Sequence, residues 1–134
     1  MIVVDSSAVA AIIFAEPDSH RLVERLTADR ERVMSVASYV EVGTVLAGRR
    51  RSEPASAQDE LDSFLTEAGI ALAPVDETQA RTALQARVAF GRGFGAPATL
   101  NFGDCFSYAL AKVLDAPLLY VGDDFAKTDI ETAV

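Results

Sequence analysis

Five acidic residues are the side chains of this sequence best placed to do chemistry. Asp5 follows the first apolar run, and Asp123 and Asp124 follow the last. Glu41 comes shortly after a second apolar run, and Asp104 stands at the start of an apolar helical segment. Carboxylate oxygens without nitrogen or sulfur partners are ligands that suit Mg²⁺ or Mn²⁺. A cation held in this way can activate water and stabilise charge on a transferring phosphoryl group.

Other catalytic residue types are scarce. The chain has one histidine, His20, and one cysteine, Cys105, among its 134 residues. This composition argues against Ser-His-Asp, Cys-His and histidine-ligated zinc sites. We interpret Cys105 as a packing residue, because the carboxylate beside it disfavours a thiolate. A single cysteine cannot form an internal disulfide and indicates a reducing cytoplasm.

Charge and hydropathy narrow the function classes further. A formal net charge of −8 argues against binding nucleic acid through bulk electrostatics. It does not exclude a metal-dependent nuclease, because clustered carboxylates count as negative until their cation binds. No apolar run reaches the roughly 18 residues that a membrane span needs, and the first run lacks the basic segment of a signal peptide. We expect one domain over residues 1–134, without a membrane anchor.

The acids can meet only if the elements around them form a parallel sheet. Short apolar runs predict strands at 1–4, 33–36, 70–74 and 117–121, with a further edge strand at 130–134. Periodic apolar residues predict intervening helices, including 8–14, 58–68 and 77–90. Loops are expected at 52–56, around Pro54, and at the glycine-rich segment 91–97. This alternation predicts an α/β fold: a three-layer α/β/α sandwich with a central parallel sheet of four to five short strands.

Apolar spacing also predicts which helix faces are buried. Three faces are expected to turn inward: Leu22, Val23 and Leu26; Leu61, Phe64 and Leu65; and Phe102, Phe106, Ala109, Leu110 and Val113. Two further helices carry apolar residues at helical spacing: Val42, Val45 and Leu46; and Ala80, Leu84 and Val88.

Helix capping offers each acid a purely structural role. Asp5 could be an N-cap, and Ser38 with Glu41 matches a capping box that would put Glu41 at the third helical position. Asn101 is a good N-cap for the helix that carries Asp104. The acidic pair after the last strand could form a turn. The other acids are expected at the carboxyl edge of one sheet, where open parallel sheets carry their sites, and Asp104 joins them if its helix starts on the same rim. This coincidence favours a site.

The sequence resembles the PIN-domain ribonucleases, specifically the VapC toxins of type II toxin–antitoxin systems. The similarity spans essentially the whole chain. It is carried by Ile-Val-Val-Asp-Ser-Ser-Ala at 2–8, by Glu41, by Leu-Asn-Phe-Gly-Asp-Cys at 100–105 with Tyr108, Ala109 and Ala111, and by Leu118-Leu119, Gly-Asp-Asp-Phe at 122–125 and Thr-Asp-Ile at 128–130.

This resemblance implies an endoribonuclease that depends on Mg²⁺ or Mn²⁺. Asp5 and Asp104 match the principal metal ligands, and Glu41 matches a third acid that holds metal or positions water. Ser7 matches a small hydroxyl residue that supports the site, and Asn101 supports it as the expected cap.

The fourth acid of the family is less clearly matched. When the family pattern is aligned on Phe125, Gly122 occupies the place of the usual first acid. Asp123 or Asp124 must then fill the role, and we favour Asp123 by position.

The resemblance also implies partners: a homodimer, a VapB-type antitoxin that blocks the acidic pocket or its groove, and a structured RNA substrate such as tRNA or ribosomal RNA. Arg49, Arg50 and Arg51 could contact phosphates, and Arg87 and Arg92 are further candidates. A solvated helix end is the alternative for the three consecutive arginines, because cations suit helix C-termini.

Two other functions stay open at this point. A phosphatase of doubly wound type needs Asp-x-Asp after the first strand, which Asp5-Ser6-Ser7 lacks, and a receiver domain needs an aspartate where Pro74 stands. A catalytically silent binding module would bind antitoxin or RNA without cleaving it.

Overall fold

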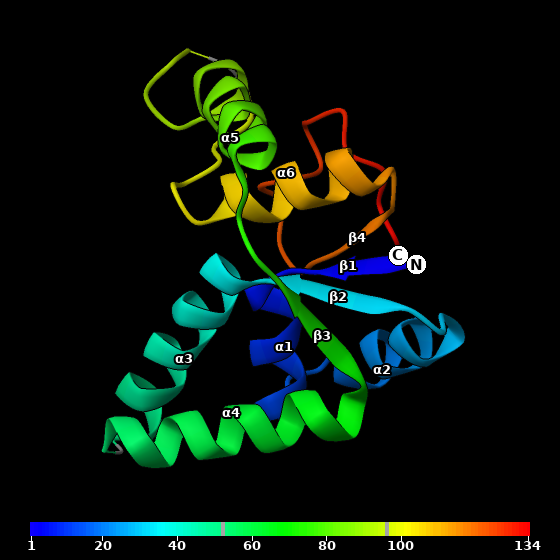
Figure 1. The fold of residues 1–134 in the computed structure, drawn as a ribbon, viewed down its shortest axis with the longest axis vertical. Coiled ribbons are helices and arrows are strands. Elements are labelled where there is room, and N and C mark those ends of the chain that lie inside the picture. Colours follow the sequence, from blue (N-terminus) through cyan, green and yellow to red (C-terminus); the bar gives the residue numbers. More distant parts are fainter. Residues whose placement is uncertain (52, 96) are drawn as a thin grey trace.

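A parallel four-stranded sheet forms the middle of the fold in a computed structural model that describes residues 1–51, 53–95 and 97–134 (Figure 1). The strands are β1 (Ile2–Val4), β2 (Arg32–Ser35), β3 (Ile70–Ala73) and β4 (Leu118–Leu119), in the order β3-β2-β1-β4. The parts of the expected loops that fall on residues 52 and 96 lie outside the described residues. The expected edge strand at 130–134 is reduced to a single bridge between Leu118 and Thr132.

Helices lie on both faces of this sheet, which confirms the predicted α/β sandwich. On one side are α1 (Ser6–Ile13), α2 (Ser19–Ala28), α3 (Val36–Arg50) and α4 (Pro54–Ala68); on the other are α5 (Glu77–Phe90) and α6 (Asp104–Leu114) (Figure 1). Ile2 and Val4 belong to the core under α1–α4, whereas Val3 packs with α5 and α6. This split follows from the two-residue alternation of a strand.

Three helices begin earlier than their sequence patterns indicate, and α1 does so by two residues, at Ser6. Ser35 caps α3 by accepting from the Ala37 amide at 3.2 Å, so the predicted capping box at Ser38 is wrong. Ser38 lies inside the helix, and Glu41 lies in its second turn rather than its first. Pro54 begins α4 instead of lying in a loop, because proline lacks the amide hydrogen that a first helical residue leaves unpaired.

Several apolar residues on these predicted helix faces are exposed. They are Val23, Val45, Ala80, Leu84, Val88, Phe102 and Val113. The α5 helix contacts α6 through small residues, Ala83 and Ala86, so the larger Leu84 on the next face is left 67% exposed. By contrast, α6 lies between the sheet and α5 and is buried over most of its length (Figure 1).

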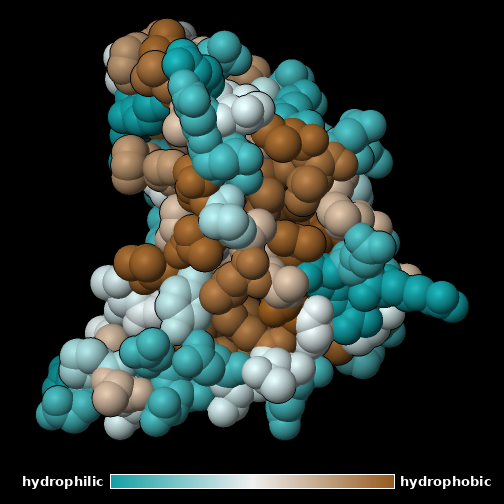
Figure 2. All heavy atoms as spheres, viewed as in Figure 1, coloured by the Kyte–Doolittle hydropathy of each residue, from teal (hydrophilic) through white to brown (hydrophobic). Residues whose placement is uncertain are grey.

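The edge strand β3 is also less buried than expected, with Ala71 and Leu72 exposed. Figure 2 shows hydrophobic side chains gathered over the middle of the viewed face, whereas the edge formed by α4 is mostly hydrophilic. Among the described helices, none combines the length and hydropathy of a membrane span.

Candidate metal centre

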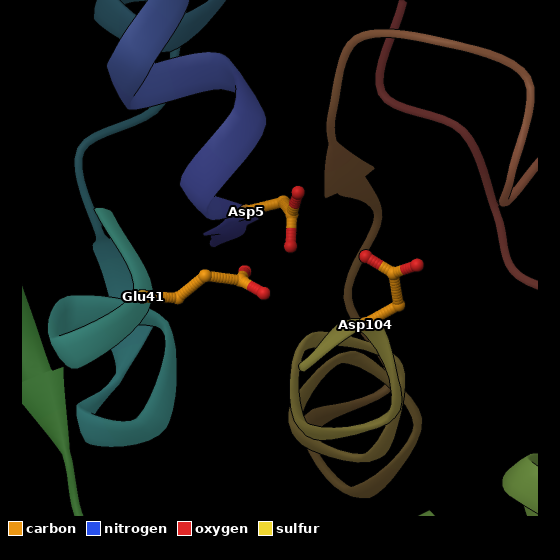
Figure 3. Close-up of side chains that lie close together, drawn as sticks. All are labelled: Asp5, Glu41 and Asp104. Atoms are coloured by element: carbon orange, nitrogen blue, oxygen red, sulfur yellow. The ribbon is translucent and has the colours of Figure 1, made fainter. Parts of the chain in front are cut away.

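Three of the predicted acids meet at the carboxyl edge of the sheet. Asp5, Glu41 and Asp104 each offer a carboxylate oxygen, and these atoms all lie within 4.8 Å of one another. Figure 3 shows the three side chains converging from the β1–α1 junction, from α3 and from the start of α6. We call these three residues the acidic cluster. They line a cleft of about 250 Å³ together with Ser6, Ser7, Asn101 and Asp124, among others.

Asp5 is both a helix cap and a member of the acidic cluster. Its Oδ2 accepts from the Ser7 amide at 3.0 Å and from the Ser7 hydroxyl at 2.7 Å, which caps α1. The Ser7 hydroxyl in turn accepts from the Val121 amide at 3.0 Å, so it ties Asp5 to the chain that leaves β4. The structural and the functional interpretation of Asp5 are therefore compatible.

Glu41 reaches the cleft from the second turn of α3. The Ser6 hydroxyl donates a hydrogen bond to its Oε1. The carboxylate lies directly over Gly103, where an added β-carbon would come within 2.0 Å of Glu41 Oε2. Sequence reasoning missed both Ser6 and Gly103. The need for glycine at 103 comes from this close approach and not from its backbone, whose φ of −64° is ordinary.

Asp104 is held by a reciprocal pair of hydrogen bonds with Asn101. The Asp104 amide donates to Asn101 Oδ1 at 2.8 Å, and the Asn101 amide donates to Asp104 Oδ2 at 3.0 Å. Asn101 thus accepts from the first amide of the helix, but Gly103 and not Asn101 is the N-cap residue, and the α-helix begins only at Asp104. Asp104 is 7% exposed, which places its charge in a poorly solvated position.

The electrostatics of the cleft favour a cation. Burial, helped by the nearby charges of Asp5, Asp124 and Glu41, raises the pKa of Asp104 to about 7 against the lowering effect of the Asn101 amide. Burial also raises the pKa of Glu41, with a smaller contribution from Asp5. Like-charged carboxylates in a dry site need a proton or a cation to coexist. A donor set made only of oxygens fits a hard divalent ion.

The structure separates the two candidates for the fourth acid. Asp124 lines the cleft, and its Oδ1 accepts from the Thr99 hydroxyl at 2.8 Å. Asp123, the residue favoured by position, is exposed and is absent from the residues that line the cleft. The chain leaves β4 through Gly122 at a φ of +99°, a left-handed turn that a sequence pattern does not show.

The predicted RNA-contacting arginines lie outside the acidic cluster. Arg49 stacks on Phe14 with its guanidinium carbon 4.2 Å from the ring centroid, and Arg50 pairs with Glu60 at 3.0 Å. Both arginines lie at the C-terminal end of α3. At the usual rise per residue, the helix advances about 12 Å from Glu41 to Arg49.

The other three arginines lie where α3 and α5 end. Arg51 adopts a left-handed conformation as the C-cap of α3. Arg87 donates to the Arg92 carbonyl at 3.0 Å and stacks on Phe94. Arg87 and Arg92 therefore hold the turn that follows α5, while none of the three lines the cleft.

Replacing Gly103 with alanine should weaken cation binding without unfolding the protein. The new β-carbon would displace the flexible Glu41 carboxylate and its hydrogen bond to Ser6. We expect Mn²⁺ affinity to fall about tenfold, as for the loss of an orienting contact, with little change in melting temperature. Titration of Mn²⁺ by calorimetry measures this. Gly48→Ala is the matched control, because nothing lies within 4 Å of its β-carbon; equal affinities in both variants would contradict the contact.

The metal-free protein should lose stability as the pH rises from 5 to 8. Folding raises the pKa of Asp104 from 3.8 to about 7, so the folded state binds its proton more tightly and is favoured at low pH. Chemical denaturation at several pH values, with chelator present, measures this loss. Asp104→Asn should remove much of the slope and stabilise the metal-free protein at pH 8 by about 1–3 kcal/mol. A wild-type stability that is flat or rising over this range would refute the assigned pKa shift.

Comparisons with known proteins identify the family of this chain. The chain matches the PIN domain family over residues 2–131. It is 44% identical to ribonuclease VapC42 of Mycobacterium tuberculosis over 131 residues, 98% of each chain, and 45% identical to ribonuclease VapC28 of the same species over 132 residues, 98% of this chain and 97% of the relative.

Solved structures show the same fold at low sequence identity. VapC20 of M. tuberculosis, described as a sarcin–ricin loop cleaving toxin, superimposes with a TM-score of 0.74 at 19% identity, covering 97% of this chain and 96% of its own. VapBC2 of Rickettsia felis, bound to a fragment of its promoter DNA, gives 0.71 at 15% identity, with coverage of 98% and 96%. The fold, the acidic cluster and the identity to curated relatives lead to one conclusion: the chain belongs to the PIN-domain family and, within it, to the VapC ribonucleases.

Proposed function

We propose that this chain is the toxin of a type II toxin–antitoxin system, a single PIN domain over residues 1–134 that hydrolyses RNA phosphodiester bonds with Mg²⁺ or Mn²⁺. Asp5, Glu41 and Asp104 would hold the cation. The observation that carries this proposal is the meeting of three carboxylates from distant parts of the sequence within 4.8 Å. Membership of the VapC ribonucleases supplies the reaction class.

The residues of the cleft have distinct roles in this reaction. When bound, a divalent cation lowers the pKa of water and neutralises charge on the phosphate. Asp5 is fixed through both of its oxygens and serves as a rigid ligand. Among the described residues none donates to Glu41 Oε2, so this atom can accept a proton from the attacking water.

Asn substitution of either buried aspartate should abolish cleavage. Asp5→Asn and Asp104→Asn keep the shape and a hydrogen-bond acceptor of the side chain but remove its charge. We expect the cleavage rate to fall by about 100-fold or more, and growth inhibition on induction to disappear. Mapping of RNA 5′ ends after induction would show the cleavage sites in wild type only.

Matched controls make this test specific. Asp59→Asn makes the same charge change on the exposed surface of α4 and should leave cleavage unchanged. Asp124→Asn should slow cleavage more than Asp123→Asn, because only Asp124 lines the cleft. If Asp104→Asn cleaves RNA at the wild-type rate with Mg²⁺ present, Asp104 is not a metal ligand. If the wild-type protein binds RNA but does not cleave it, the chain is a catalytically silent binding module.

The partners of the proposed toxin follow from its charge and its relatives. A VapB-type antitoxin would inhibit it by placing a cationic side chain in the acidic cleft or by covering its entrance. A solved structure described as a toxin–antitoxin complex from Klebsiella pneumoniae shares the fold of this chain. We propose a structured RNA, such as tRNA or ribosomal RNA, as the substrate, and the cytoplasm as the place of action.

The exposed apolar residues near the start of α6 support a homodimer. Phe102 is 73% exposed and Leu84 67%, and both border a hollow of about 180 Å³ between α5 and α6. Val88 lies one helical turn beyond Leu84 and is exposed as well. Large apolar side chains that cluster on a surface indicate an interaction site. We assign this surface to a second copy of the chain.

Charge substitution on this surface should dissociate the dimer. Leu84→Glu and Phe102→Glu would each bury an unpaired carboxylate at the interface, and we expect the dissociation constant to rise at least about tenfold. Sedimentation velocity over a range of concentrations measures the change. Val23→Glu on α2 introduces the same charge at another exposed apolar residue and serves as control. A wild type that stays monomeric at concentrations far above those of the cleavage assay would refute the proposal.

A further inference from the structure

Two buried serines connect the acidic cluster to the core of the protein. Ser38 on α3 and Ser107 on α6 are both 0% exposed, and their hydroxyl oxygens lie 2.9 Å apart. The Ser107 hydroxyl donates to Asp5 Oδ1 at 2.6 Å. Side chains from α3, α6 and the end of β1 therefore form one continuous chain of hydrogen bonds that ends on a carboxylate of the cluster.

The direction of this chain follows from the number of hydrogens. A serine hydroxyl has one hydrogen to donate, and that of Ser107 goes to Asp5. The Ser38 hydroxyl must therefore donate to Ser107. Hydrogen bonds that point the same way polarise one another, so Ser38 strengthens the bond that Ser107 makes to the charged carboxylate.

Asp5 is thereby held at both of its oxygens. Ser107 donates to Oδ1, whereas the amide and hydroxyl of Ser7 donate to Oδ2. Donors on opposite sides prevent the carboxylate from rotating. Groups that orient a metal ligand in this way commonly change metal affinity by about 10–100-fold when they are removed.

We propose that Ser107 is a positioning residue for Asp5 and that Ser38 supports it, so that the pair fixes the carboxylate in the orientation that binds the cation. The inference rests on the proposed function, in which Asp5 is a metal ligand. It also gives α6 a second role, because the helix delivers Asp104 and, one turn later, the hydroxyl that holds Asp5.

The test compares Mn²⁺ affinity in Ser107→Ala, Ser38→Ala and the double variant, measured by calorimetry on folded protein. Ser107→Ala should weaken binding about tenfold and Ser38→Ala by less. The double variant should match Ser107→Ala, because Ser38 acts only through Ser107. In cleavage assays, the Mn²⁺ concentration for half-maximal activity should rise with little change in kcat at saturating Mn²⁺.

Matched variants separate this role from a general loss of packing. Tyr108→Phe removes another hydroxyl of a buried α6 side chain, which donates to Asp129 and not to Asp5, and should leave the affinity unchanged. In an Asp5→Asn background, Ser107→Ala should change affinity no further. Unchanged affinity in both Ser107→Ala and Ser38→Ala, with a wild type that binds Mn²⁺, would overturn the positioning role alone. A wild type that does not bind Mn²⁺ would overturn the proposed function and this inference together. If Ser107→Ala does not fold, Ser38→Ala decides.

Discussion

Repulsion between buried carboxylates is the constraint on which the site depends. Asp5 and Asp104 are almost fully buried, and their oxygens share a small space with those of Glu41. The protein holds them there because their backbones belong to rigid elements. Asp5 follows the strand that lies between two others, and its amide donates to the Leu119 carbonyl at 2.9 Å. The sheet thus keeps the carboxylates close together, although their mutual repulsion would favour moving them apart.

Neutral donors orient these carboxylates without cancelling their charge. The three acids accept hydrogen bonds from neutral groups: the side-chain hydroxyls of Ser6, Ser7 and Ser107 and the backbone amides of Ser7 and Asn101. None of the ion pairs among the described residues includes a member of the acidic cluster. A lysine or arginine in these places would relieve the repulsion and remove the need for a metal. Because hydroxyls and amides do the positioning, the negative charge of the cleft stays available for a cation.

Sequence patterns predicted the site residues whose position depends on strand order. They did not predict those whose position depends on packing between helices. Asp5 could be placed because it directly follows an apolar strand, whereas the arrival of Asp104 at the same edge depends on where α6 begins, which strand order alone does not determine. Ser107 and Gly103 could not be placed in this way, because their roles arise where α6 meets Asp5 and Glu41. One signal was available for Ser107: it lies three residues after Asp104 and so shares its helix face.

The N-cap of α3 lies at Ser35 and not at the predicted Ser38, and this difference explains how α3 contributes to the site. If the helix began at Ser38, the carboxylate of Glu41 would fold back onto the first turn as a capping group. Because Ser35 caps the helix instead, Ser38 and Glu41 become neighbours on one face within it. That face meets α6, where Ser38 contacts Ser107 and Glu41 lies over Gly103. Because α3 begins three residues earlier than predicted, Ser38 and Glu41 do not form a capping box and instead contribute to the metal site.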